Sequence, residues 1–279
     1  RRVGLSDLVI GLTVVAFGTS APEFAVTVGA ALTGRGDIAV ANVIGSNIFN
    51  IGLILGGAAL FSHLRASRTA VRRDGPILVG VAILGSYMLW DGVFEVYEAL
   101  ILVALLVTYL TVLFVRREAP DEELPEESSD RSSWVLSVVL VAGLAGVAVG
   151  GRLLVDAASS LAEAAGVPQW LIGLTIVAAG TSASELATSL MAVIRGRQDM
   201  LVGNLIGSDI FNMLGVLGVA GLLQRIQLET PIHLSLGFFV ATCLFAALCL
   251  RRGQGLTRVE GLVLVLMGLG RWAHAFIVS

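Results

Sequence analysis

The chain has 279 residues, of which 56% are hydrophobic and only 14% are charged. This composition excludes an ordinary soluble globular protein and a disordered chain, and it is typical of a protein that lives in a lipid bilayer. The net charge is −3, and the 18 basic residues are all arginines that stand between hydrophobic runs without forming a continuous basic face, so nucleic acid is excluded as a partner.

Long apolar runs predict nine membrane-spanning helices, because about 20 apolar residues in a helix cross a hydrocarbon core of about 30 Å. In chain order they cover roughly residues 8–32, 38–61, 76–90, 96–115, 134–160, 170–194, 200–223, 231–250 and 257–277. The connections are short and leave no room for a large soluble domain. The longest connection, residues 116–133, carries two prolines and seven acidic residues, and we expect a solvated linker there.

The two halves of the chain are repeats of each other. Residues 11–50 and 173–212 align at a constant offset of 162 and are identical at 23 of 40 positions. The first copy contains Gly-Thr-Ser-Ala-Pro-Glu and then Asn-Val-Ile-Gly-Ser-Asn-Ile-Phe-Asn, and the second contains Gly-Thr-Ser-Ala-Ser-Glu and then Asn-Leu-Ile-Gly-Ser-Asp-Ile-Phe-Asn. We therefore predict a first transmembrane repeat at 1–117, an acidic cytoplasmic linker at 118–132 and a second transmembrane repeat at 133–279.

The second repeat has a helix before its motif, at 134–160, where the first repeat has only ten residues, so we expect the first helix of the first repeat to be missing. Five helices per repeat is an odd number, so the second copy is expected to cross the membrane in the opposite sense. With the amino end in the cytoplasm, 14 of the 18 arginines fall on the cytoplasmic side. The sequence thus predicts an all-α polytopic membrane protein built on an inverted repeat, with its carboxyl end outside.

Glu23 and Glu185 stand about halfway along their helices, near the bilayer centre. An ionisable group there costs roughly 2.5–3.5 kcal/mol on insertion scales, so it normally faces a cavity or pairs with a partner. No arginine or histidine is predicted at matching depth. The natural partner is then a cation from solution, and oxygen-only surroundings favour a hard ion such as calcium or sodium. The alternative is two protonated glutamates satisfied by helix packing.

Residues beside each glutamate are expected to break the helix. Pro22 lacks an N–H, and with residues 18–20 it predicts a local break whose carbonyl and hydroxyl oxygens line a water-filled cavity. The alternative is a proline kink used only for packing. In the second copy Ser184 replaces the proline, so we expect a softer kink there.

Polar residues on the next helix recur every four positions and share one face: Asn42, Ser46 and Asn50 in the first copy, and Asn204, Ser208 and Asn212 in the second. Short links make each pair of motif helices an antiparallel hairpin, which is expected to bring Asn50 to about the depth of Glu23. Such stripes line a site or hold helices together. Asp209 stands where the first repeat has Asn47, and it is expected either to carry a proton or extra positive charge or to serve as a hydrogen-bonding neighbour of the site.

This doubled pair of motifs resembles the calcium/cation antiporter family of sodium/calcium exchangers. The resemblance implies a ten-helix fold whose motif helices enclose four cation sites. It implies that calcium, and alternately sodium, is bound by the two glutamates with oxygens of further residues: Thr19, Ser20, Thr181, Ser182, Ala16, Ala178, Ser46, Asn50, Ser208 and Asn212. Archaeal exchangers often have an aspartate at the position of Asn212, and Asp209 is expected to compensate for its absence here.

We therefore expect a secondary antiporter that exchanges calcium for sodium by alternating access, and not an enzyme. A calcium/proton exchanger on the same fold stays open as the alternative. A cation channel is less consistent with an internal inverted repeat. The expected partners are calcium and sodium ions and the lipid bilayer of a prokaryotic inner membrane, with no cofactor and no obligate protein partner.

Overall fold

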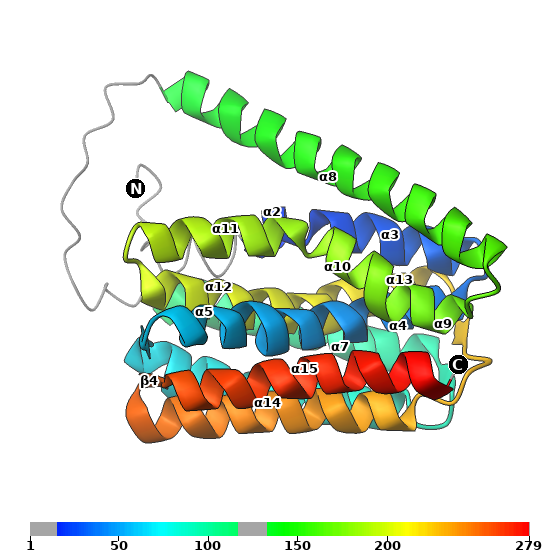
Figure 1. The fold of residues 1–279 in the computed structure, drawn as a ribbon. Coiled ribbons are helices and arrows are strands. Elements are labelled where there is room, and N and C mark those ends of the chain that lie inside the picture. Colours follow the sequence, from blue (N-terminus) through cyan, green and yellow to red (C-terminus); the bar gives the residue numbers. More distant parts are fainter. Residues whose placement is uncertain (1–15, 117–132, 279) are drawn as a thin grey trace.

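The computed structural model describes residues 16–116 and 133–278, and the structural statements below refer to these residues. Nearly all of them are helical (Figure 1). The helical elements of the first repeat are α2 (Ala16–Thr19), α3 (Ala21–Leu32), α4 (Gly36–Ile48), η2 (Phe49–Leu55), α5 (Gly56–Phe61), η3 (Ala70–Asp74), α6 (Gly75–Met88) and α7 (Val96–Arg116). The elements labelled η are π-helical turns within longer helices.

The second half contains a longer set of helices. They are α8 (Ser133–Ala164), α9 (Gln169–Ile172), η4 (Gly173–Val177), α10 (Ala178–Thr181), α11 (Ala183–Ile194), α12 (Gln198–Phe211), η5 (Asn212–Leu217), α13 (Gly218–Leu223), α14 (His233–Gly253) and α15 (Arg258–Val278). Adding 162 to the bounds of α3, α5 and α7 gives the bounds of α11, α13 and α15. The offset found in 40 aligned residues therefore holds through the described part of the first repeat.

All nine predicted spans are helical where the structure describes them. Five continuous helices are long and apolar enough to cross a membrane: Gly36–Phe61, Val96–Val115, Gln198–Leu223, His233–Gly253 and Arg258–Ile277. A sixth span is a broken one, in which Gln169–Thr181 and Ala183–Ile194 meet at a bend of 43°. The other three predicted spans correspond to α2–α3, to η3–α6 and to α8. The helix predicted at 76–90 begins earlier, at Ala70, because a π-helical turn precedes it.

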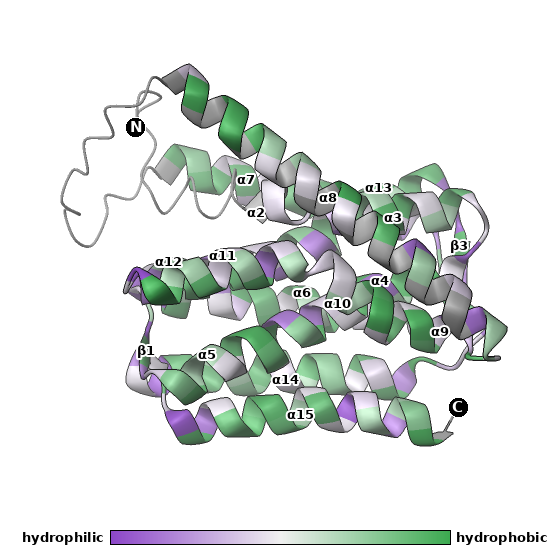
Figure 2. Cartoon of the chain, turned by 45° about the horizontal axis from the view of Figure 1, so that its top comes forward, coloured by the Kyte–Doolittle hydropathy of each residue, from purple (hydrophilic) through white to green (hydrophobic). Residues whose placement is uncertain are grey.

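Four two-residue strands, which the sequence did not predict, join the repeats. Strand β1 (Leu64–Arg65) pairs antiparallel with β4 (Gly255–Leu256), and β2 (Val93–Phe94) pairs antiparallel with β3 (Ile226–Gln227). The offset of 162 carries β1 onto β3 and β2 onto β4, so exchanging the repeats maps one strand pair onto the other. The two pairs lie at opposite ends of the helical bundle, as an inverted repeat requires (Figures 1 and 2).

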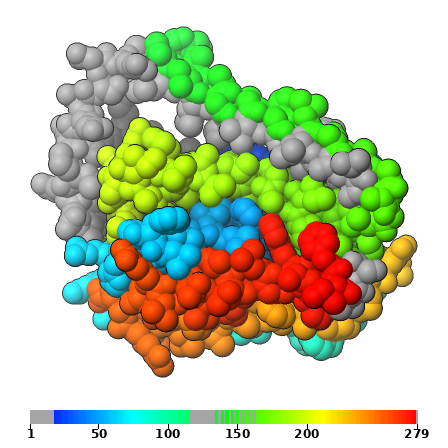
Figure 3. All heavy atoms as spheres, in the orientation of Figure 1, coloured from blue at the N-terminus to red at the C-terminus, as the bar shows by residue number. Residues whose placement is uncertain are grey.

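The motif helices lie in the interior. Most side chains of α4 and α12 are buried, whereas α7 and α15 expose large apolar side chains such as Leu100, Leu105 and Leu266. Hydrophilic segments gather at the two ends of the bundle and inside it near α4 (Figure 2). On the outside, the side chains of α15 pack directly beside those of α5 (Figure 3). This distribution is typical of a protein surrounded by lipid. The apolar side chains lie on the outside, and the polar side chains in the interior lie on the motif helices.

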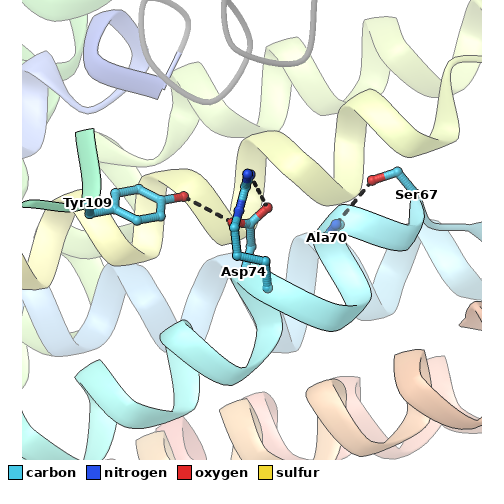
Figure 4. A network of polar contacts seen from close by, with 5 residues as sticks. Ser67, Ala70, Asp74 and Tyr109 are labelled. Carbon is cyan, nitrogen blue, oxygen red and sulfur yellow. Dashed lines mark hydrogen bonds and ion pairs between the residues drawn. The ribbon is translucent and has the colours of Figure 1, made fainter. Parts of the chain in front are cut away.

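A buried polar contact ties η3 to α7. Asp74 is fully buried, its Oδ1 atom lies 2.7 Å from Arg73 Nε, and Tyr109 donates a hydrogen bond to the same oxygen at 3.4 Å (Figure 4). The repeat equivalent of Tyr109 is Arg271, which is also buried and donates to Ser235 at the start of α14. Both repeats therefore use a polar tie at this position, built from different residues.

Candidate cation site

Both motif helices are interrupted three residues before the glutamate. The first breaks at Ser20, with φ −79° and ψ 6°, and the second at Ser182, with φ −74° and ψ 9°. The two breaks are nearly the same although only the first copy has a proline, so the prediction of a softer second break is wrong. Pro22 lies in the first turn of α3, where a backbone N–H has no acceptor within the helix. The break itself therefore does not depend on the proline.

The breaks place both carboxylates in the first turn of a new helix. Glu23 lies in the first turn of α3 and Glu185 in the first turn of α11, and both side chains are fully buried. The partial positive charge of a helix N-terminus stabilises a carboxylate in the first turn. Among the described residues no ion pair reaches either glutamate. The N-termini of α3 and α11 therefore compensate the negative charge of the two carboxylates.

Each glutamate is held by a serine of the other repeat. Ser182 donates to Glu23 Oε1 at 3.0 Å, and Ser20 donates to Glu185 Oε1 at 3.3 Å. These two hydrogen bonds exchange under the offset of 162. The next pair of contacts does so as well, since Thr19 Oγ1 lies 3.4 Å from Ser208 Oγ and Thr181 Oγ1 lies 3.3 Å from Ser46 Oγ. The predicted threonines and serines thus converge where the two repeats meet.

Ser184 adds a contact that the first repeat lacks. Its Oγ atom lies 2.8 Å from Glu185 Oε2 and 2.7 Å from the Thr19 carbonyl oxygen. A serine hydroxyl has one proton, so it donates to one of these acceptors at a time. Pro22 occupies the equivalent position and offers no hydroxyl. The two carboxylates are therefore held differently, because Glu185 has contacts at both oxygens.

A second layer consists of three asparagines and one aspartate. Asn50 donates to Asp209 Oδ1 at 3.0 Å, and its equivalent, Asn212, donates to Asn47 Oδ1 at 3.1 Å. Asn47 also donates to the main-chain oxygen of Asp209 at 3.2 Å. All four side chains are fully buried. Asp209 therefore takes the place of an asparagine in a symmetric cluster.

Several buried oxygens of this region have no hydrogen-bond partner among the described residues. They are Glu23 Oε2, Asn50 Oδ1, Asp209 Oδ2 and Asn212 Oδ1. Carboxylate and amide oxygens accept hydrogen bonds and do not donate them when the carboxylate is ionised. Buried acceptors are rarely left unpaired in proteins. A region with four of them is chemically suited to a cation.

The predicted residues lie together with two differences. Asn42, and not Asn50, is beside the main chain of Glu23, because its Nδ2 atom lies 3.4 Å from the Glu23 carbonyl oxygen. Asp209 contacts Asn50 and is not grouped with both glutamates, since no three His, Cys, Asp or Glu side chains in the described ranges are placed to hold a metal ion. An ion here would need hydroxyl, amide and carbonyl oxygens besides a carboxylate. Ala178 is buried in α10, and the side chain of its equivalent, Ala16, is not described.

Sequence reasoning missed two residues of the site. Asn47 was noted only as the equivalent of Asp209, yet it accepts a hydrogen bond from Asn212 and donates one to the main-chain oxygen of Asp209. Ser184 was interpreted only as a replacement for proline, yet it contacts Glu185. The repeat alignment was the available signal for both, because each is the position where a motif differs between copies.

The chain is similar to known proteins over most of its length. A family model described as sodium/calcium exchanger protein matches residues 1–115 and 135–267. The sodium/calcium exchanger MaX1 of Methanosarcina acetivorans is 30% identical over 95% of this chain and 88% of its own length. The inner membrane protein YrbG of Escherichia coli is 35% identical over 95% of this chain and 85% of its own length.

A solved structure gives the same result for the fold. The sodium-calcium exchanger NCX_Mj superposes with a TM-score of 0.78 and is 32% identical, covering 97% of this chain and 88% of that one. The polytopic helical fold expected from the doubled motif is therefore confirmed. With the family model matching most of both halves, this chain belongs to the sodium/calcium exchanger protein family.

Proposed function

We propose that this integral membrane protein is an antiporter that exchanges calcium for sodium at the site between its two repeats. The observation that carries the proposal is the set of four unpartnered buried oxygens beside two first-turn glutamates. Relatives named sodium/calcium exchangers support the choice of ions. The family is one of transporters, and no chemical reaction is proposed.

The charges of the site suit mutually exclusive occupancy. Two glutamates neutralise one divalent calcium ion, and several sodium ions can spread over the same oxygens instead. We propose that the ligands are the residues expected from the motif: Glu23, Glu185, Thr19, Ser20, Thr181, Ser182, Ser46, Asn50, Ser208, Asn212, the carbonyls of Ala16 and Ala178, and Asp209. Because neither ion set fits while the other is bound, binding of one drives release of the other. Alternating exposure of the site to the two faces then couples the fluxes.

The distribution of charge supports an orientation in the membrane. Arginines gather at the end that carries the β1–β4 pair, namely Arg65, Arg68, Arg72, Arg195, Arg197, Arg251, Arg252 and Arg258. The opposite end, with the β2–β3 pair, carries mostly acidic residues, namely Asp37, Asp91, Glu95, Glu98 and Glu229. Since positive loops are retained in the cytoplasm, we place the β1–β4 end inside and the carboxyl end of the chain outside a prokaryotic inner membrane.

The test is transport by the purified protein in sealed vesicles. Calcium uptake is expected when an outward sodium gradient is imposed and not when only an outward proton gradient is imposed. Uptake with protons alone would make the protein a calcium/proton exchanger, and passive calcium flux without saturation would make it a channel.

Two site variants check where the calcium binds. Glu23→Gln and Glu185→Gln are each expected to abolish uptake, because the remaining carboxylate cannot neutralise a divalent ion. Glu163→Gln is the matched control, since Glu163 is exposed on α8. Near-normal uptake by either site variant would remove the two-carboxylate site from the proposal.

A further inference from the structure

A buried arginine on α15 has no acidic partner. Arg271 is only 5% exposed, and its Nε and Nη2 atoms both donate to the hydroxyl oxygen of Ser235 on α14. Its third nitrogen, Nη1, is buried and has no hydrogen-bond partner among the described residues. A buried charge normally has a partner of opposite charge, because leaving it uncompensated is costly.

The elements packed against α15 do not supply that charge. They are α5, η2 and α14, and none of the three contains an aspartate or a glutamate. The one carboxylate of α15 itself is Glu260, in its first turn. Arg271 lies eleven residues further along the helix, which is about 16 Å at 1.5 Å per residue. No ion pair to Arg271 occurs in the part of the chain that the structure describes.

The first repeat has a carboxylate at the equivalent place. The offset of 162 carries Arg73, Asp74 and Tyr109 onto Ser235, Leu236 and Arg271. In the first repeat the arginine is paired with Asp74 at 2.7 Å, and Tyr109 donates to the same carboxylate (Figure 4). In the second repeat the arginine stands at the position of the tyrosine, and a leucine stands at the position of the carboxylate. This place therefore keeps a cation and lacks its anion.

Arg271 lies near the membrane surface. α15 ends seven residues after it, about 10 Å along the helix, and its partner Ser235 is the third residue of α14. The end of α15 and the start of α14 are at the same end of the bundle, which the proposed orientation places outside (Figure 1). The first turn of α14 adds partial positive charge. Exposed apolar side chains on the same two helices offer a surface to acyl chains: Leu234, Leu269 and Ile277.

We propose that Arg271 and Ser235 bind a phosphate oxyanion, supplied by a phospholipid headgroup of the outer leaflet or by free phosphate. The guanidinium provides Nη1 and the compensating charge, and arginine is well matched to phosphate oxygens. The Ser235 hydroxyl accepts both arginine bonds and donates none within the described ranges, so its proton is available to the anion. Nη1 is covered here, and the flexible side chain turns toward the headgroup level to meet the phosphate, as long basic side chains do at membrane surfaces.

The first experiment measures thermal unfolding of the purified protein in detergent, with phosphatidylglycerol, with inorganic phosphate or with neither. The melting temperature is expected to rise by about 5 °C or more at about 100 times the dissociation constant. Arg271→Gln is expected to lose this rise, and to be no less stable than the parent without ligand, because the uncompensated charge is gone. Arg225→Gln is the matched control, since Arg225 is exposed at the same end of the bundle and already paired with Glu95 at 2.7 Å.

The two sources of phosphate give different results. A rise with phosphatidylglycerol and not with inorganic phosphate assigns the site to a lipid headgroup, and a rise with inorganic phosphate assigns it to the free ion. A rise of the same size in Arg271→Gln, or no rise in the parent with either ligand, would overturn the proposal.

A second pair of variants supplies the missing charge instead of removing the arginine. Leu236→Asp places a carboxylate at the position aligned with Asp74, where it faces Arg271 as Asp74 faces Tyr109. This carboxylate competes with the phosphate, so the dissociation constant of the ligand that stabilises the parent is expected to rise about tenfold or more. Leu236→Asn is the matched control, because it has the same shape without the charge, and it should bind like the parent. An equal loss of affinity in both variants would attribute the effect to packing and contradict the proposal.

Discussion

Replacing Asp209 with asparagine is expected to make the protein more stable while impairing its coupling to sodium. The repeat symmetry supplies the geometry. Asn47 donates from Nδ2 to the main-chain oxygen of Asp209 at 3.2 Å, whereas the corresponding atom of Asp209 is an oxygen without a partner in the described part of the chain. In Asp209→Asn that atom becomes an amide nitrogen facing the main-chain oxygen of Asn47. The existing bond from Asn50 to Oδ1 at 3.0 Å is retained.

The size of the gain follows from two contributions. A new neutral hydrogen bond contributes about 1 kcal/mol, and removing an unsatisfied buried acceptor relieves about 1–3 kcal/mol. We therefore expect the free energy of unfolding to rise by about 2 kcal/mol or more in the absence of ions. For a chain of this size, 1 kcal/mol corresponds to roughly 2–4 °C, so the melting temperature should rise by about 4 °C or more.

The assay is thermal unfolding of the purified protein in detergent with a calcium chelator and without sodium, followed by sodium-driven calcium uptake in vesicles. Asp199→Asn is the control, because it makes the same chemical change at an exposed position of α12. A melting temperature below that of the parent would refute the symmetry argument. An unchanged dependence of uptake on sodium would show that Asp209 is not a ligand.

Three further substitutions test the packing around the site. Gly45→Ala is expected to destabilise the repeat interface by about 1–3 kcal/mol, since its Cβ atom would lie 2.5 Å from the Leu174 carbonyl oxygen, while Gly57→Ala, with nothing within 4 Å, should be neutral by the same unfolding measurement. Tyr109→Phe removes a hydrogen bond to the buried carboxylate of η3 and should lower stability by about 1.5–3 kcal/mol, measured by chemical unfolding. Ser184→Pro should still fold and take up calcium, because the first repeat forms the same break with a proline, and loss of the folded protein would contradict that equivalence.

The helices and the two glutamates could be predicted because their signals are local. An apolar run of sufficient length specifies a span wherever it occurs, and the doubled motif identifies Glu23 and Glu185 without any knowledge of contacts. The two-residue strands could not be predicted in this way. Leu64 pairs with Leu256 across most of the chain, and two residues carry no periodicity.

The contacts within the site were harder to predict than the residues that form it. The repeat offset shows that Asn47 and Asp209 are equivalent, but it does not say which residue faces each of them. That depends on how two hairpins cross, which is a property of packing. The sequence did not predict that the hairpin crossing would place Asn42 beside the Glu23 main chain.

The two repeats differ at three aligned positions that contact the polar groups of this site. Ser184 stands opposite Pro22, Asp209 opposite Asn47 and Thr188 opposite Val26. In the second repeat Ser184 contacts Glu185, Asp209 accepts a hydrogen bond from Asn50, and Thr188 accepts one from Asn204. Because these differences are fixed by the sequence, they persist in every conformation. The polar surroundings of Glu185 therefore stay different from those of Glu23 whichever face the site opens to.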